Sequence, residues 1–321
     1  MVTHRPRVAG GAVTAGVPAA TRMTGSDVAG AIDTATRTPV PAASNPNHVH
    51  ARPATDQVSR PPGAAAFDSA LAASLAPPTQ RLVTPTLDVM TEPLSPKVGW
   101  GVLHLFWKIT PTTDAEAATS AVKSCIADDH QVITFATLGH KADVGTMVVG
   151  PDLWRLRRLQ TELSHAGLLL VDSYVSFTEV SEYAKGAPEA MTRPRLYPGT
   201  MPPEGMRAVC FYPMSKRRGV GTDDANWFTL PFEDRNRLMH DHGKSGRTFA
   251  GRISQFVTGS TGVDDYEWGV TLFAHDPADL KEVVYTMRFD EASALYGEFG
   301  PFISGMVDAP EVVFGELTRS R

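Results

Sequence analysis

The chain has little cysteine. Cys125 and Cys210 are the only two among 321 residues, which is too few for a disulfide framework and fits no CxxC metal motif. We expect two buried free thiols in a reducing compartment, the cytoplasm. Long apolar runs are also missing: no stretch approaches the roughly 20 residues that cross a bilayer, and the N-terminus lacks the apolar core of a secretory signal. We therefore expect neither a membrane span nor export.

Positive charge of the kind that attracts nucleic acid is lacking as well. The formal net charge is −5 and the isoelectric point is about 6.1. A chain without a net positive charge is not expected to bind nucleic acid. Since 42% of the 321 residues are hydrophobic, the chain can form one large domain or two ordinary ones.

Aromatic residues are nearly absent from the first part of the chain. Residues 1–94 are rich in Ala, Pro, Thr, Gly and Ser, and Phe67 is their only aromatic residue. Such a segment cannot bury enough apolar surface to offset the entropy lost on ordering. We therefore predict a disordered N-terminal tail over 1–94. Because the tail carries more Arg than acid, a weak docking role stays open beside that of a solvated extension.

The composition changes near residue 95, and residues 95–185 predict a first folded half. Strand-like apolar runs alternate with segments of helical spacing in the order β-α-β-β-α-β. The predicted strands are 98–107, 131–138, 144–149 and 168–180, and the predicted helices are 114–129 and a segment from 151 onward. This order is that of a ferredoxin-like unit.

The same order recurs in residues 207–308. The segment ADVGTMVVGPDLWRLRRLQTEL of the first half is similar to YEWGVTLFAHDPADLKEVVYTM of the second, as expected of an internal repeat. The predicted strands are 207–212, 252–258, 268–274 and 302–307; the predicted helices are 231–242 and a segment from 280 that breaks near 290. We predict an α+β fold of duplicated ferredoxin-like units forming a dimeric α+β barrel, with a linker over 186–206 and a C-terminal tail over 309–321.

One predicted helix of the second half, PFEDRNRLMHDHG, carries two histidines. Pro231 suits the first helical position and Gly243 suits the stop. At about 100° per residue, His242 shares a face with Leu238, whereas His240 lies on the opposite, charged face. His242 is thus expected to point inward and is a candidate axial iron ligand. A hydrogen-bonded core histidine is the alternative, and the spacing alone does not decide between the two.

Basic and aromatic residues recur around this helix. Tyr212 and Lys216 flank a turn in FYPMSKRR, a weak signal that an ordinary strand end would also give. Arg195, Arg247 and Arg288 each lie in a motif-like run. If the fold gathers them, they suit a ligand with several carboxylates; taken singly, each suits a surface salt bridge.

A polar residue interrupts the apolar face of the strand RISQFVTG. Gln255 is in phase with Ile253 and Val257. A polar side chain on such a face needs a partner or a ligand. A hydrogen-bonded core amide and a place in a binding pocket both remain open.

Taken together, these runs resemble the coproheme decarboxylases of the chlorite dismutase-like superfamily. The matching segments are RLYP, FYPMSKRR, NWFTLPFEDR, MHDHGKSGR, QFVTGSTGVDDYEWGVTLFAHD and VVYTMRFDEASALYGEFGPF. They extend almost continuously from 195 to 302, and the first half matches more loosely through VSFTEVSEY. Residues 1–94 lie outside the resemblance.

The resemblance implies a role for each matched residue. His242 would be the proximal iron ligand, with Glu291 bonded to its outer nitrogen. Tyr212 would be the redox-active tyrosine that forms a radical beside the reacting propionate. Gln255 and Met214 would lie on the distal side of the iron. The propionates would be bound by Lys216, Arg195, Tyr183, Arg288 and Ser293, with Arg247 a weaker candidate.

The implied reaction is the conversion of two propionates of Fe-coproporphyrin III (coproheme) to vinyl groups by hydrogen peroxide, which yields haem b. Coproheme would be both substrate and redox cofactor, and the enzyme would be a cytoplasmic homopentamer. Two other classes remain open: a chlorite dismutase-like haem enzyme, although those enzymes place Arg where this chain has Gln255, and a non-catalytic porphyrin-binding protein. An interaction protein acting through the 1–94 tail is a further alternative.

Overall fold

The computed structural model describes residues 92–221 and 224–319, all within the compact unit Val83–Arg321. The tail predicted over 1–94 lies almost wholly outside these residues. Among the helices of the described residues, none is both long and apolar enough to cross a membrane.

The first half has the predicted order of elements. It consists of β1 (Gly101–Lys108), α1 (Ala115–Ala127), β2 (Gln131–Thr137), β3 (Val144–Gly150), α2 (Leu153–His165) and β4 (Leu169–Thr178). An Asp caps the N-terminus of each helix: Asp114 accepts hydrogen bonds from two backbone N–H groups of α1, and Asp152 accepts one from α2. The caps explain where each of the two helices begins.

The second half repeats this order with additions. It consists of β5 (Ala208–Lys216), η2 (Trp227–Thr229), α4 (Phe232–Arg247), β6 (Ile253–Gly259), β7 (Trp268–Ala274), α5 (Pro277–Met287), α6 (Glu291–Ala294), β8 (Gly297–Phe299) and β9 (Ile303–Val307). The predicted break near 290 is confirmed, because α6 follows α5 there. Between the halves lie η1 (Glu182–Ala184) and α3 (Glu189–Leu196), so the segment expected as a linker is partly helical.

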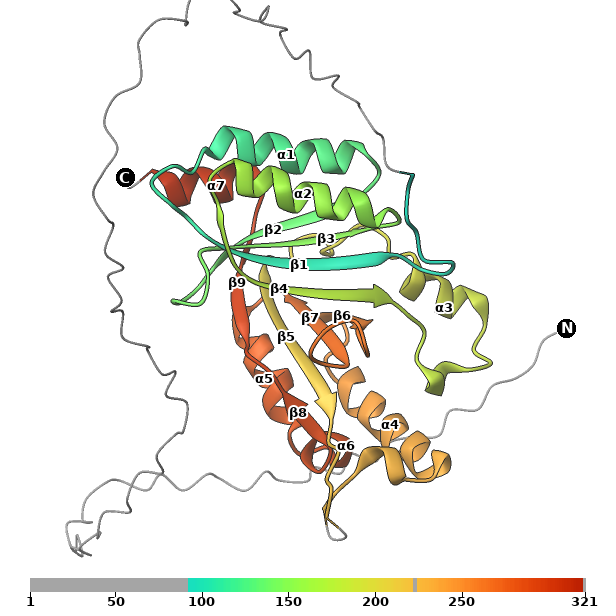
Figure 1. Cartoon of the computed structure of the whole chain (residues 1–321). Coiled ribbons are helices and arrows are strands. Elements are labelled where there is room, and N and C mark those ends of the chain that lie inside the picture. The colour runs from blue at the N-terminus through green and yellow to red at the C-terminus, as the bar shows by residue number, and fades with distance from the viewer. Residues whose placement is uncertain (1–91, 222–223, 320–321) are drawn as a thin grey trace, which may run out of the picture. The chain divides into compact units, whose positions relative to one another are not determined.

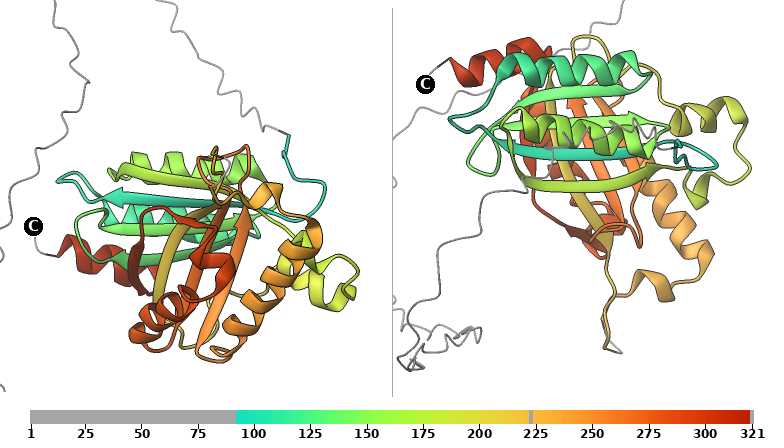
Figure 2. Two further views of the ribbon diagram at one scale, coloured as in Figure 1. Left: turned by 90° about the horizontal axis from the view of Figure 1, so that it is seen from below. Right: turned by 45° about the horizontal axis from the view of Figure 1, so that its top comes forward.

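The strands pair antiparallel in one sheet, in the order β7-β6-β4-β1-β3-β2-β9-β5-β8, and β5 also pairs with β7. Within each half the strands therefore follow one pattern: β4-β1-β3-β2 in the first and β9-β5-β7-β6 in the second. The two halves meet where β4 pairs with β6 and where β2 pairs with β9. The α+β class with an antiparallel sheet is thus confirmed (Figures 1 and 2).

The inner faces of the strands from both halves form one core. Val102 and Phe106 of β1 pack there with Phe211 of β5 and Phe273 of β7. A polar contact joins the halves in this core, since His104 Nε2 lies 2.9 Å from the Thr271 hydroxyl. Burial lowers the pKa of His104 to about 3, so its ring is neutral.

The outer face of the first half is sealed by three helices. Leu105 and Trp107 of β1 are fully buried beneath α1 and α2, and Figure 2 shows these helices side by side with α7 (Pro310–Thr318). The expectation of a tail over 309–321 is wrong for this helix. Val313 and Phe314 are buried in the same core as α1, because the amphipathic spacing of α7 gives it an apolar side.

Candidate functional site

Helix α4 carries the two histidines singled out by the sequence. Glu233 and Asp234 in its first turn and basic residues in its last turn suit the helix dipole. The side chain of His240 is 73% exposed and that of His242 is 29% exposed, in agreement with the helical phase. The expected stop at Gly243 is wrong: α4 continues to Arg247, since a glycine within a helix weakens it without ending it.

His242 is held by a buried carboxylate. Its Nδ1 lies 2.8 Å from an Asp290 carboxylate oxygen, and the Asp290 side chain is almost fully buried. Because a carboxylate only accepts, Nδ1 carries a proton, and in the neutral form of the ring the lone pair lies on Nε2. The Ser293 backbone N–H and hydroxyl donate to the same Asp290 oxygen at 3.2 and 3.3 Å. Asp290, His242 and Ser293 thus form one connected group.

The expected partner of His242, Glu291, does not make this contact. Glu291 is exposed and forms an ion pair with Arg237 at 3.6 Å. The physical reason is the position of α6: Asp290 is its N-cap residue and faces inward, whereas Glu291 begins the helix and faces outward. The assignment of the outer-nitrogen bond to Glu291 is therefore corrected to Asp290. Ser293, expected at a propionate, donates to Asp290.

Strand β5 carries Tyr212. Its side chain is buried, with 8% of the residue exposed, and its ring stacks on Phe302 at a centroid distance of 4.5 Å. Burial raises the pKa of Tyr212, so the phenol keeps its proton at neutral pH. Among the described residues, no group hydrogen-bonds the Tyr212 hydroxyl. The phenol is thus positioned by packing alone, and its polar end is left for another partner.

Lys216 lies two residues beyond Met214 on the same face of β5, with only 6% of the residue exposed. Its Nζ donates to the Ala292 carbonyl at 2.9 Å and lies 4.4 Å from the centre of the Trp227 ring. Burial lowers the pKa of Lys216 to about 8, partly offset by the charges of Asp290 and Glu267. Its ammonium group is therefore buried beside α6.

The outer face of β6 is the open part of the second half. Alternation places Gln255 on the same face as Val257, and both are exposed, while the intervening Phe256 is buried in the inner core. The alternative of a hydrogen-bonded core amide for Gln255 is wrong, because the Gln255 residue is exposed. An exposed amide among apolar side chains remains available to a ligand.

The remaining predicted residues lie at the periphery. Arg195 on α3, Arg247 at the end of α4 and Arg288 after α5 are exposed, and none forms an ion pair within the described part of the chain. Arg288 lines a cleft of about 750 Å³ between α5 and the strands β5 and β9. The structure does not bring these arginines into contact with the His242 group.

Tyr183, in η1, has a buried hydroxyl without a hydrogen-bond partner among the described residues. Its ring stacks on Phe232 of α4 at 5.9 Å, and burial raises its pKa to about 12. The Nε of Arg235, one turn further along α4, is likewise buried without a partner. These two unpaired donors lie beside the helix of His242 and could serve an anionic group.

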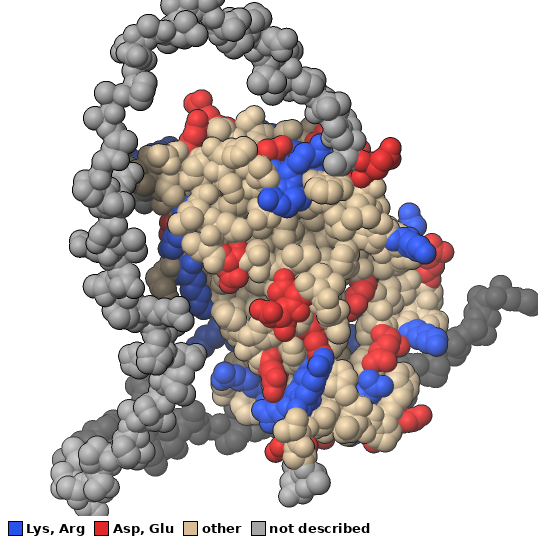
Figure 3. Space-filling model, viewed as in Figure 1, with Lys and Arg blue, Asp and Glu red and all other residues tan. Residues whose placement is uncertain are grey.

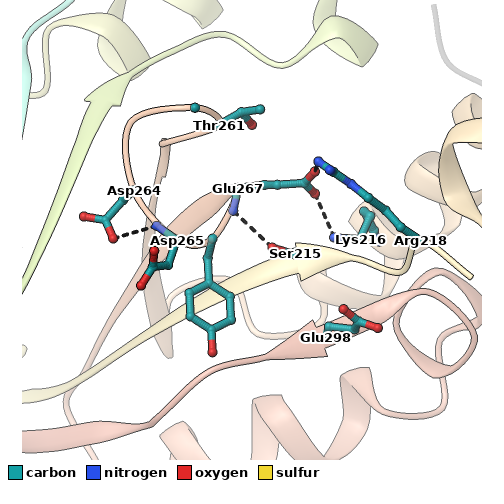
Figure 4. Close-up of a pocket in the computed structure, with 10 residues that line it drawn as sticks. Ser215, Lys216, Arg218, Thr261, Asp264, Asp265, Glu267 and Glu298 are labelled. Carbon is teal, nitrogen blue, oxygen red and sulfur yellow. Dashed lines mark hydrogen bonds and ion pairs between the residues drawn. The ribbon is translucent and has the colours of Figure 1, made fainter.

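Figure 4 shows a second cleft, of about 400 Å³, where β5 ends near the β6–β7 loop. Its charged lining residues are Lys216, Arg218, Asp264, Asp265, Glu267 and Glu298. Glu267 accepts from the Lys216 backbone at 2.9 Å and from the Arg218 guanidinium at 2.6 Å. Acidic side chains gather near the centre of the face in Figure 3. This cleft therefore does not suit an anion, and its contacts fix the end of β5.

The surroundings of His242 fit an iron macrocycle. The Nε2 atom of His242 is a single nitrogen donor, as an axial ligand of a macrocyclic iron is. In the described residues, no group of three or more His, Cys, Asp or Glu side chains could hold a metal ion. Gly246 lies one turn after His242 on the same side of α4, and a Cβ there would meet no atom within 4 Å. This part of the helix leaves room for a flat ligand.

Three residues of this site escape a reading of the sequence alone: Asp290, Trp227 and Arg235. Asp290 could have been found as the cap of a helix that restarts at Glu291, because Asp is a preferred N-cap residue. Nothing in the local pattern predicts that Trp227 packs against Lys216, since the contact joins a loop to a strand end.

Comparisons with known proteins agree with this geometry. The family model for chlorite dismutases matches residues 112–307. The coproheme decarboxylase of Staphylococcus carnosus (strain TM300) is 39% identical in an alignment of 234 residues; the match covers 65% of this chain and 92% of that protein. A solved structure described as a novel heme-binding protein from Thermus thermophilus shares 36% identity with a TM-score of 0.61, covering 68% of this chain and 95% of its own.

A mutant chlorite dismutase from Candidatus Nitrospira defluvii has a TM-score of 0.56 and 17% identity, covering 70% of this chain and 98% of its own, and shows the fold alone. The resemblance deduced from the motifs is confirmed by the longer matches. They cover more than half of this chain and nearly all of the Staphylococcus protein. The chain therefore belongs to the chlorite dismutase family.

Proposed function

We propose that this chain is a coproheme decarboxylase, which converts Fe-coproporphyrin III to haem b with hydrogen peroxide. The observation that carries the proposal is the buried phenol of Tyr212. Its hydroxyl has no hydrogen-bond partner among the described residues. Tyr212 lies on β5, in the same half of the chain as the His242–Asp290 pair. A protein that only carries haem has no need of an oxidisable side chain there. The 39% identity to the Staphylococcus enzyme supports the same reaction.

His242 would hold the iron through Nε2. The hydrogen bond to Asp290 fixes the tautomer and raises the basicity of the ligating nitrogen. Gln255 and Met214 would face the opposite side of the iron. The four carboxylates of the substrate would be bound by groups at the edge of the site: Tyr183, Arg195, Lys216, Arg288 and Ser293, with Arg247 a weaker candidate.

Each of the two steps removes one propionate. The propionate, hydrogen peroxide and one proton give a vinyl group, carbon dioxide and two waters, so the peroxide is reduced as the side chain is oxidised. The iron supplies the two-electron oxidation by peroxide when coproheme is bound. Tyr212 would lose a hydrogen atom from its hydroxyl and then regain one from the propionate β-carbon, the carbon attached to the porphyrin ring. Loss of a second electron from that carbon, together with carbon dioxide, would leave the vinyl group. Because its raised pKa keeps the phenol protonated, a hydrogen atom rather than a proton is available for transfer.

We further propose that the two halves arose by duplication of a ferredoxin-like unit and form a dimeric α+β barrel. The recurring strand pattern and the pairing of β5 with β7, which joins the ends of the eight-strand series, support this. We also propose a cytoplasmic homopentamer. The two buried free thiols, Cys125 and Cys210, suit a reducing compartment.

A non-catalytic haem-binding role is the second candidate, because the relative from Thermus thermophilus is described only as heme-binding. One experiment separates the two. The purified chain is loaded with coproheme, hydrogen peroxide is titrated, and the porphyrin products are followed by mass spectrometry. Two successive losses, each of one propionate converted to vinyl, are expected. An unchanged porphyrin mass over the titration would reject the enzyme and leave the carrier.

A further inference from the structure

One edge of β5 is paired irregularly. Phe211 of β5 lies opposite Ile303 of β9, whereas Met214 lies opposite Phe299 of β8. Two residues of β5 therefore face three residues, 300–302, of the segment that joins β8 to β9. This arrangement is a β-bulge, in which one extra residue interrupts the pairing and turns the side chains near it, and such bulges are common beside active sites.

The extra residue brings two aromatic rings to the face of β5 that carries Tyr212. In a regular strand, residues three apart such as Phe299 and Phe302 point to opposite faces. The bulge changes this phase, so both rings contact Tyr212. Phe302 stacks on the Tyr212 ring at a centroid distance of 4.5 Å, and Phe299 lies tilted against it at 5.8 Å. One short segment thus supplies both aromatic neighbours of the phenol.

Gly300 holds the start of the bulge against β5. Its backbone N–H donates to the Pro213 carbonyl at 2.9 Å. A Cβ at position 300 would lie 2.6 Å from the Pro213 ring and 2.7 Å from the Tyr266 ring, which is closer than packed carbon atoms approach. Because only glycine fits this contact, residue 300 determines how near the segment comes to Tyr212.

The first half of the chain holds the end of the bulge. Lys141, in the loop between β2 and β3, donates from Nζ to the Phe302 carbonyl at 2.6 Å. Phe302 also lines the cleft of about 750 Å³ beside α5, so its ring has space into which it could turn away from Tyr212. The contact with Lys141 keeps the Phe302 backbone in place beside that space.

We propose that the bulge 300–302 is a positioning element that confines the ring of Tyr212, with Phe302 as the positioning residue and Lys141 as its support. This inference rests on Tyr212 being the reactive tyrosine of the proposed function. Since no hydrogen bond from the described residues fixes the phenol, its orientation depends on the rings packed against it. Transfer of a hydrogen atom needs a fixed distance and direction between the reacting groups, and a confined ring provides both.

The test observes the ring itself in the full chain without coproheme. The tyrosines are labelled with carbon-13 at both ring ε positions, and the Tyr212 signals are identified as those missing from Tyr212→Phe. A confined ring gives two separate ε signals, and exchange between them measures the rate of ring flips by NMR. Phe302→Ala is expected to raise this rate about tenfold, because a stacked aromatic neighbour is lost. A single averaged signal in the unmodified chain, or an unchanged rate in Phe302→Ala, overturns the inference.

Further variants grade the effect. Gly300→Ala is expected to move the bulge away from β5 and to raise the flip rate, whereas Lys141→Met keeps both rings and should raise it less. Phe289→Ala is the matched control: that ring is 73% exposed and packs on Tyr285, so the rate should not change. An equal rise in Phe289→Ala and Phe302→Ala would contradict the inference. Phe302→Leu replaces the alanine variant if that variant does not fold, with the same direction expected.

Turnover keeps this inference apart from the proposed function. In Phe302→Ala, kcat for coproheme with peroxide is expected to fall about tenfold or more, while the dissociation constant of coproheme stays the same, because the ring acts on Tyr212 and not on the ligand. If the unmodified chain converts no coproheme, the proposed function fails, and the flip rates still decide whether the bulge confines the ring. If it converts coproheme and faster flips leave kcat unchanged, only the positioning role fails.

Discussion

The two halves of the molecule share one strand order and differ in what covers the outer face of the sheet. In the first half, Leu105, Trp107 and Val148 are fully buried beneath helices. In the second half, Gln255 and Val257 of β6 are exposed. The same arrangement of strands thus supports a closed core on one side of the molecule and an open face on the other.

The difference comes from the first helix of each half. In the first half, α1 packs on β2 and also on α2 and α7. In the second half, α4 packs mainly against α5 and α6. Its C-terminal part carries Gly243 and Gly246, which offer little side-chain surface to fill the space. We infer that the first half supplies stability and that the second uses the same topology to leave room for a ligand.

The largest effect should come from Tyr212→Phe. This change removes the transferable hydrogen atom but keeps the ring that stacks on Phe302. Turnover of coproheme with peroxide is expected to fall by more than about a thousandfold, equivalent to about 4 kcal/mol in the barrier. The measurement is the rate of carbon dioxide release under peroxide titration.

Two controls belong to the Tyr212 variant. Coproheme binding and the thermal unfolding midpoint are expected to stay close to those of the unmodified chain, because no group of the described residues bonds the lost hydroxyl. Normal turnover by Tyr212→Phe would show that another residue carries the oxidation. A loss of binding together with turnover would mean that the hydroxyl holds the substrate.

Leu159→Ala tests the closed half. Leu159 on α2 is fully buried in the first-half core, so its truncation leaves a cavity and is expected to lower the free energy of unfolding by about 4 kcal/mol. Leu169→Ala on β4 is the matched control, because Leu169 is exposed and should cost about 0.5 kcal/mol or less. Chemical denaturation measures both. If Leu159→Ala weakened coproheme binding at temperatures where it is folded, the division of roles between the halves would be wrong.

Much of the fold follows from the sequence because apolar periodicity is local. The strand β7 at 268–274 agrees with its prediction, and helical phase separated His242 from His240. Apolar periodicity does not predict the residue at which the helix restarts as α6. Whether residue 290 or 291 faces His242 depends on the capping geometry of a four-residue helix, and an offset of one residue exchanged Asp290 for Glu291.

The contacts of the site are harder to predict than its residues. The sequence indicates that Lys216 belongs to the site, but its burial against Trp227 depends on a loop that folds back on the end of β5. The helix α7 was missed for a related reason: its apolar side is short, and its burial depends on α1, which lies far away in the sequence.

The burial of Lys216 predicts a pH dependence of stability. The pKa of Lys216 is lowered to about 8 in the folded chain from its ordinary 10.5. Between these values the unfolded chain binds more protons, so stability rises with pH. Relative to Lys216→Met, the free energy of unfolding should increase by about 2 kcal/mol between pH 7 and 9.5. Urea unfolding of both chains at the two pH values measures the difference. If the free energy of unfolding changed equally with pH in both chains, the Lys216 side chain would be solvated rather than buried.

The smallest effect is the most direct probe of the open face. Gly246→Ala adds a methyl group where no atom lies within 4 Å, so the ligand-free chain should gain about 1 kcal/mol from the higher helix propensity of alanine. Gly243→Ala is the matched control, with Arg247 Nη1 as its nearest contact at 3.5 Å and a direction about 100° away from His242.

Both glycine variants should be more stable without ligand, as measured by thermal unfolding. Only Gly246→Ala should weaken coproheme binding several-fold, because its methyl group projects from the same side of α4 as His242. Equal coproheme affinity in the two variants would show that the macrocycle does not lie against this side of the helix. In that case the glycines are not kept for the ligand, and the open face of the second half needs another explanation.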